Sequence, residues 1–173
     1  MNTKFFASLL SASAIALSSI AMFSSPSHGQ RSTYSFFCGR STDGVPTTFA
    51  ATATGKKIAV IRWVRQWSPK YPPKARCRAV SSRFQNAYAS GVLNYLTNTR
   101  VNRQDVICAA RRYGGSCNQM LLTLRPGENV SQVIENLRQM GHTASGPLVQ
   151  APDGSPRTFV DMNRLLRQAS AVK

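Results

Sequence analysis

Acidic residues are scarce in this chain, because 6 Asp and Glu stand against 22 Lys and Arg and leave a formal net charge of +16 over 173 residues. Histidine is scarce as well, with 2 residues. A disordered polycation is excluded, since 42% of the residues are hydrophobic. The sequence also shows no internal repeat. Its length therefore predicts one folded domain with a single core.

The sequence also lacks the patterns that identify common catalytic and cofactor sites. Gly114-Gly115 is not followed by the Lys-Ser/Thr of a phosphate-binding loop. His142 follows a glycine, and no serine or cysteine nucleophile motif accompanies it. The acids occupy expected turn, cap and helix-surface positions, so nothing in the pattern pairs two carboxylates. These acids are Asp43, Asp105, Glu128, Glu135, Asp153 and Asp161. We predict no catalytic residue and no cofactor.

Residues 1–29 have the composition of a secretory signal segment. Lys4 gives the positive start, residues 5–23 form an uncharged apolar stretch with several serines, and small residues lead up to Gln30. We expect cleavage near Gln30, with a site after Ala21 as the alternative. A membrane anchor is the other interpretation, and the serines weaken it. Without this segment the chain keeps 21 basic and 6 acidic residues, a charge of +15.

Short segments rich in β-branched and aromatic residues alternate with turn signals and predict strands. Ile58 to Ile61 is apolar on both faces, which is typical of a strand inside a sheet. A hairpin is expected across Asn102-Arg103. The strands are predicted at residues 34–38, 46–53, 57–64, 93–99, 105–110 and 119–125.

Three segments have helical patterns. Between residues 74 and 90 the apolar positions repeat with the period of one helical face, and Gly91 follows as the ending residue. Asn129 is placed to cap a second helix. Thr158 or Asp161 would cap a third. The expected fold class is α+β, an antiparallel sheet of about five to seven strands with two or three packed helices, within one domain at residues 30–173.

The cysteine count is even, which indicates disulfide bonds in an exported chain. Cys38, Cys77, Cys108 and Cys117 allow three pairings. Cys108 and Cys117 flank a Gly-Gly loop after a strand and are placed to close a hairpin, which leaves Cys38 with Cys77. A zinc site would need cysteine pairs spaced as C-x₂₋₄-C, which this sequence lacks, so we predict no metal.

Cations and aromatic residues interleave in one part of the chain. Between Asp43 and Asp105 lie 61 residues with no acid and eleven Lys or Arg. Within them we expect Trp63 in the core, while Trp67 suits core or surface equally. A second basic-aromatic tip is expected in the loop between Cys108 and Cys117. The candidate anion-binding residues are Arg62, Arg65, Lys70, Lys74, Arg111 and Arg112, and the candidate aromatic contacts are Trp67, Tyr71 and Tyr113.

Several short motifs lie around the cysteines and on the segments between them. They include Phe37-Cys38-Gly39, Asp43-Gly44-Val45-Pro46-Thr47-Thr48, Ile61-Arg62-Trp63, Arg76-Cys77, Val80-Ser81-Ser82-Arg83-Phe84-Gln85, Leu93-Asn94-Tyr95-Leu96-Thr97, Val106-Ile107-Cys108 and Leu122-Thr123-Leu124. With these motifs the chain resembles the cyanobacterial circadian oscillating protein family over residues 34–140. The resemblance implies a small exported protein, and the founding member is described as a peripheral membrane protein with rhythmic abundance. It implies no established activity, ligand or active site.

The sequence thus favours a non-enzymatic, disulfide-bonded protein of the periplasm, cell envelope or lumenal membrane surface. Its expected partner is an anionic membrane surface or an acidic envelope polymer. A hydrolase acting on envelope polymers is one alternative. A secreted nucleic-acid-binding protein is another, since cations and aromatic rings also serve phosphate neutralisation and base stacking.

Overall fold

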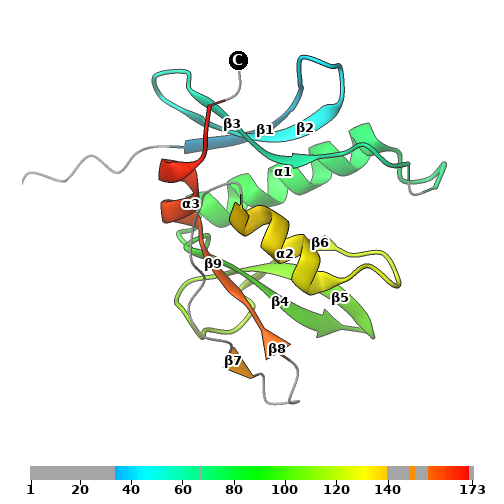
Figure 1. The fold of residues 1–173 in the computed structure, drawn as a ribbon, viewed down its shortest axis with the longest axis vertical. Helices are drawn as coiled ribbons and strands as arrows, with labels where there is room; N and C mark the ends of the chain where they lie inside the picture. Colours follow the sequence, from blue (N-terminus) through cyan, green and yellow to red (C-terminus); the bar gives the residue numbers. More distant parts are fainter. Residues whose placement is uncertain (1–33, 67, 140–148, 151–155, 172–173) are drawn as a thin grey trace, which may run out of the picture. The chain divides into compact units, whose positions relative to one another are not determined.

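The computed structural model describes residues 34–66, 68–139, 149–150 and 156–171 (Figure 1). The side chains at residues 138–139, 149–150 and 156 are not among the described ones. The expectations for residues 1–29, for Trp67, for His142 and for Asp153 lie outside the described residues.

The first sheet is built from three antiparallel strands in the order β1-β2-β3. They are β1 (Tyr34–Arg40), β2 (Pro46–Thr52) and β3 (Lys57–Arg62). Gly44 and Gly55 lie in the two connecting turns with positive φ angles of 79° and 85°, a conformation that glycine adopts without steric cost. Phe36, Ala50 and Ile58 of this sheet are buried in the main core.

Helix α1 (Pro73–Ala89) lies between this sheet and a second one (Figure 1). A proline at the first helical position suits a helix start, because its missing N–H would have no partner there. The buried residues recur at helical spacing, and Phe84 is fully buried. On its other side α1 meets β6, where the guanidinium group of Arg83 donates to the carbonyl of Leu121 over 3.1 Å. The predicted helix at residues 74–90 is therefore confirmed.

The second sheet has four antiparallel strands in the order β6-β5-β4-β9. They are β4 (Tyr95–Val101), β5 (Gln104–Ala110), β6 (Gln119–Thr123) and β9 (Phe159–Asp161). Asn102 and Arg103 form the turn between β4 and β5, with φ angles of 49° and 63°. Positive φ at both central residues is typical of the tight turn whose twist matches a hairpin.

Two further helices and a short strand pair complete the described residues. They are α2 (Val130–Gln139), β7 (Val149–Gln150), β8 (Pro156–Arg157) and α3 (Met162–Gln168). The side chain of Asn129 accepts the backbone N–H of Gln132 over 3.1 Å, as predicted for the cap of α2. Asp161, of the two candidates, caps α3 by accepting the N–H of Arg164 over 2.9 Å.

The α+β class with antiparallel strands, packed helices and disulfide bonds is confirmed. The strands are divided between sheets on two sides of α1, where the sequence pattern suggested one sheet. Apolar periodicity identifies which face of a strand is buried, but it does not identify the neighbouring strand. Fully buried side chains from both sheets, such as Ile58, Leu96 and Ile107, share one core with Phe84 of α1.

Candidate functional site

Two disulfide bonds fix the parts of the fold that carry the candidate residues. Cys38 of β1 is bonded to Cys77 of α1 with a Cα–Cα distance of 5.5 Å. Cys108 of β5 is bonded to Cys117 with a Cα–Cα distance of 5.3 Å. Both predicted pairings are confirmed. The first joins the three-stranded sheet to α1, and the second closes the loop between β5 and β6.

Trp63 anchors the segment that joins β3 to α1. It is 4% exposed, so the expectation that it belongs to the core is confirmed. Its indole N–H donates to the hydroxyl of Thr48 over 3.0 Å, and Ser81 of α1 bonds to the same hydroxyl over 2.9 Å. A buried tryptophan usually finds a partner for this N–H. The bonds tie the end of β3 to β2 and to α1.

Arg76 of α1 packs over the ring of Trp63. Its guanidinium carbon lies 4.7 Å from the centre of the Trp63 ring. Burial lowers the pKa of Arg76 below its ordinary value, while the carboxylate of Glu128 acts in the opposite direction. Two hollows, of about 350 and 470 Å³, are both lined by Trp63, Arg76 and Leu122. Their walls are mainly apolar, with Glu128 as the carboxylate of the first hollow.

Beyond Trp63 the chain projects outward past the first turn of α1 (Figure 1). Val64 is 64% exposed and Tyr71 is 51% exposed, although both are large hydrophobic residues. Arg65, Lys70 and Lys74 are exposed around them. The ammonium group of Lys70 lies 5.8 Å from the centre of the Tyr71 ring. We call these five residues the basic loop.

The basic loop has no acidic residue within its sequence, and α1 has none in its first turn. Positive potential from the helix N-terminus therefore adds to the charge of Lys74. The backbone N–H of Tyr71 donates to the carbonyl of Ser68 over 3.0 Å just before α1 begins, and Lys74 lies in the first turn of α1.

Arg62 differs from the other predicted cations, because it forms an ion pair with Asp43. A hydrogen bond from Ser41 is the main cause that lowers the pKa of Asp43, and the charge of Arg62 lowers it further. Both members of the ion pair are about half exposed. The carboxylate of Asp43 thus partly neutralises the positive charge of Arg62.

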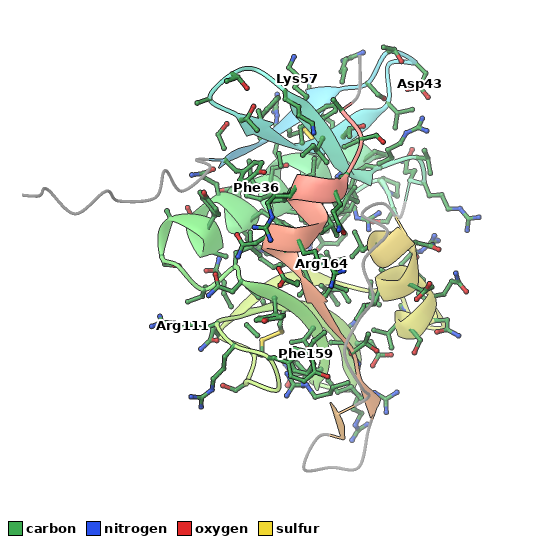
Figure 2. All side chains as sticks on the ribbon, turned by 60° about the vertical axis from the view of Figure 1, so that its left-hand side comes forward. Phe36, Asp43, Lys57, Arg111, Phe159 and Arg164 are labelled. Carbon is green, nitrogen blue, oxygen red and sulfur yellow. A yellow bond between two sulfur atoms is a disulfide. The ribbon has the colours of Figure 1, made fainter. Side chains whose placement is uncertain are left out.

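The second predicted cluster, Arg111, Arg112 and Tyr113, lies in the disulfide-closed loop between β5 and β6. We call it the basic tip. Arg111 and Arg112 are exposed, and Tyr113 is 38% exposed. Figure 2 places Arg111 far from Asp43, the ion-pair partner of Arg62, so the structure does not bring the candidate cations Arg62 and Arg111 together.

The described residues contain neither a cluster of metal-binding side chains nor a membrane-spanning helix. Within the described ranges, no three or more His, Cys, Asp or Glu side chains gather closely enough to hold a metal ion. Among the described helices, none combines the length and the apolar character that crossing a membrane requires.

Some residues of these surfaces could not be identified from the sequence. Arg76 and Glu128 come together although 52 positions separate them, and Asn94, Tyr95 and Asn163 line a hollow beside the basic tip. No motif assigns these residues to a common surface, since only the folded chain brings them together. Their proximity follows from how helices, strands and loops pack, which local periodicity does not report.

Comparison with known proteins identifies a family. No curated protein and no solved structure matches this chain. A family model described as "Circadian oscillating protein COP23" matches residues 35–167. This range contains all four cysteines, the basic loop and the basic tip, and it spans more than half of the sequence. The chain therefore belongs to the circadian oscillating protein COP23 family.

Proposed function

We propose that this protein is an exported, non-enzymatic peripheral protein that binds an anionic membrane surface through the basic loop. The observation that carries the proposal is the exposure of Val64 and Tyr71 among Arg65, Lys70 and Lys74. Exposed apolar side chains next to cations can enter the headgroup region while the charges meet lipid phosphates.

The expected strength follows from the charges. Each Lys or Arg close to an anionic leaflet contributes about 1 kcal/mol, so three cations contribute about 3 kcal/mol. Tyrosine is enriched at membrane interfaces because its ring is apolar and its hydroxyl is polar. Such a contact is strong enough for reversible attachment.

The rest of the molecule favours approach to such a surface. The formal charge of +15 that remains without residues 1–29 attracts the exported chain to any polyanion at low ionic strength. Among the described acids, Asp43 and Asp105 form ion pairs, with Arg62 and Arg100. Neither Asp43 nor Asp105 belongs to the basic loop.

A membrane explains the basic loop better than the two other polyanions do. An acidic polysaccharide or a nucleic acid has no hydrocarbon layer that would take up the side chain of Val64. Base stacking needs exposed aromatic rings, and here Trp63 is buried, while Tyr71 offers one ring that is 51% exposed. The apolar half of the loop therefore favours lipid.

Vesicle sedimentation tests the proposal. The protein should bind vesicles that contain phosphatidylglycerol, should not bind pure phosphatidylcholine, and should be released as the Debye length falls from about 10 Å at 0.1 M salt to about 3 Å at 1 M. Replacing Arg65, Lys70 and Lys74 by Gln should weaken binding about 100-fold. The matched variant, with Lys56, Arg164 and Arg167 replaced by Gln, loses the same charge from elsewhere and should bind within a few-fold of wild type. Equal losses, or binding that survives 1 M salt, contradict the proposal.

A second pair of variants separates lipid from other polyanions. Val64→Ser and Tyr71→Ser keep every charge, so they should weaken vesicle binding while retention on a heparin column stays unchanged. If both variants bind vesicles like the wild type, charge alone accounts for the binding. That result would favour a charged polymer over a lipid surface as the partner.

Export is part of the proposal and is tested separately. Mass spectrometry of the native protein should find its N-terminus near Gln30 or after Ala21. An intact Met1 in a soluble cytosolic pool contradicts export.

A further inference from the structure

A hollow of about 390 Å³ lies beside the basic tip, away from the basic loop. Its walls come from four parts of the chain: the start of β4, the loop between β5 and β6, the end of β9 and the first turn of α3. The lining residues besides the tip are Asn94, Tyr95, Asp161 and Asn163. We propose that this hollow is a binding site for an anionic saccharide.

The backbone of the basic tip is held in place from both sides. The N–H of Arg111 donates to the side-chain oxygen of Asn118 over 3.0 Å, and the side-chain amide of Asn94 donates to the carbonyl of Arg111 over 2.9 Å. The N–H of Gly115 donates to the carbonyl of Arg112 over 3.0 Å. A Cβ atom at Gly115 would lie 2.9 Å from that carbonyl oxygen, so the turn requires glycine.

A buried arginine, Arg157, forms a hydrogen bond to the loop that carries the basic tip. Arg157 is 8% exposed and donates to the carbonyl of Asn98 over 3.1 Å and to the carbonyl of Gly115 over 2.9 Å. Its guanidinium carbon also lies 5.1 Å from the centre of the Phe159 ring. Hydrogen bonds to a charged donor are stronger than neutral ones. Arg157 therefore acts as a positioning residue for the loop.

These bonds, with the Cys108–Cys117 disulfide, restrain the loop before any ligand arrives. A rigid loop loses little conformational entropy on binding, which raises affinity for small ligands. A surface loop without a binding role does not require this number of hydrogen bonds to its backbone. The arrangement is that of a pre-formed site.

Tyr95 and Tyr113 line the hollow, and both rings contact the buried ring of Phe159. The Tyr113 ring lies 6.0 Å from the ring of Tyr95 and 5.1 Å from the ring of Phe159, measured between ring centres (Figure 2 labels Phe159). These contacts fix the orientation of a ring that is 38% exposed. The negative face of an aromatic ring attracts the weakly positive C–H groups of a sugar.

The polar groups of the hollow suit both parts of an anionic sugar. Arg111 and Arg112 are both exposed, so a ligand can reach their guanidinium groups. A guanidinium group matches a carboxylate through two parallel hydrogen bonds. Asn163 and Asp161 can bond to hydroxyl groups, the amide as donor or acceptor and the carboxylate as acceptor.

Asp161 also decides between ligand classes. Two arginines against one aspartate leave the hollow positively charged, which favours an anion. A nucleic-acid backbone would present phosphates to Asp161 and gain no hydrogen bond there, whereas a sugar presents hydroxyl donors. The mixture of charges therefore favours a uronic-acid type of saccharide over a nucleic acid.

Isothermal titration with tetragalacturonate tests the inference, with maltotetraose as the neutral control and a dT oligonucleotide as the alternative anion. We expect tetragalacturonate to bind, with at least tenfold weaker binding of the other two. Amide chemical shifts should change at Tyr95, Tyr113 and Asn163. Equal affinity for the neutral sugar, or tighter binding of the oligonucleotide at these residues, overturns the inference.

Matched variants separate a shaped site from a general attraction of charge. Arg111→Lys with Arg112→Lys keeps the charge and removes the two-pronged donors, so saccharide binding should fall about tenfold. The basic-loop variant, with Arg65, Lys70 and Lys74 replaced by Gln, should keep it. If the lysine variant binds like wild type, or the basic-loop variant loses as much, the hollow is not the site. Vesicle binding should respond in the opposite way to the two variants, so failure here is distinguishable from failure of the proposed function.

Discussion

The guanidinium carbon of Arg76 lies 4.7 Å from the centre of the Trp63 ring, and this contact joins the two ends of the segment that carries the basic loop. Trp63 follows β3 and Arg76 lies in the first turn of α1. Because Trp63 and Arg76 fix both ends of this segment to the core, the positions of the exposed residues between them are restrained.

This relationship predicts how the anchor contributes to stability. Trp63→Ala removes a buried ring and should lower the free energy of unfolding by about 3–5 kcal/mol. Arg76→Met keeps much of the side-chain packing and loses the charge over the ring, so it should cost about 0.5–1 kcal/mol. Urea unfolding followed by circular dichroism measures both values. A cost below 1 kcal/mol for Trp63→Ala would show that the ring is not part of the core.

The two disulfide bonds should differ in their contributions, because they close loops of different length. In the chain-entropy treatment, the Cys38–Cys77 bond with its sequence separation of 39 contributes about 4 kcal/mol, and the Cys108–Cys117 bond with a separation of 9 contributes about 3 kcal/mol. Thermal unfolding of the two double alanine variants tests the order. A larger loss for the shorter loop contradicts this account.

Asp43 should respond to acid in a defined direction. Its pKa is lowered from 3.8, first by the hydrogen bond from Ser41 and then also by the charge of Arg62. A carboxyl group with a lowered pKa stabilises the fold above its unfolded value, and this contribution is lost as the pH falls through the folded value. Ser41→Ala should therefore raise the pKa of Asp43, and Arg62→Gln should raise it less. NMR titration of the carboxyl group measures the pKa of Asp43 in each protein. A pKa above 3.8 in the wild type contradicts this account.

The turn between β4 and β5 leaves room for improvement. Arg103 has a φ angle of 63°, which is unfavourable for a residue with a side chain. Arg103→Gly would create the Asn-Gly pair favoured in this turn and should stabilise the protein by about 0.5–1 kcal/mol. Asn102→Ala is the contrasting variant and should destabilise it. Chemical unfolding that shows Arg103→Gly to be less stable than wild type would mean that the Arg103 side chain makes a contribution of its own.

The sequence predicted those features that depend on local chemistry. The spacing of Cys77, Val80 and Phe84 indicated the buried face of α1, and Asn129 indicated the start of α2. The pairing of the cysteines followed from the short loop after β5. In each case the signal lies within a few residues or one helical face.

Features that depend on distant segments were not predicted. The division of the strands into sheets on both sides of α1 depends on which strands pair, and no local pattern encodes that choice. The roles of Arg76 and Arg157 were missed for the same reason, because their partners Trp63 and Asn98 lie in other parts of the chain. Arg62 was predicted as a candidate anion-binding residue, and its ion pair with Asp43 was not foreseen because it depends on the fold of the first sheet.

The most direct test of the proposed function is paramagnetic broadening of amide NMR signals by a spin-labelled lipid in anionic nanodiscs. The account predicts the strongest broadening at Val64, Arg65 and Tyr71, weak broadening at Arg112 and Tyr113, and loss of the pattern in high salt. Broadening that is strongest at the basic tip, or uniform over the surface, would contradict attachment through the basic loop.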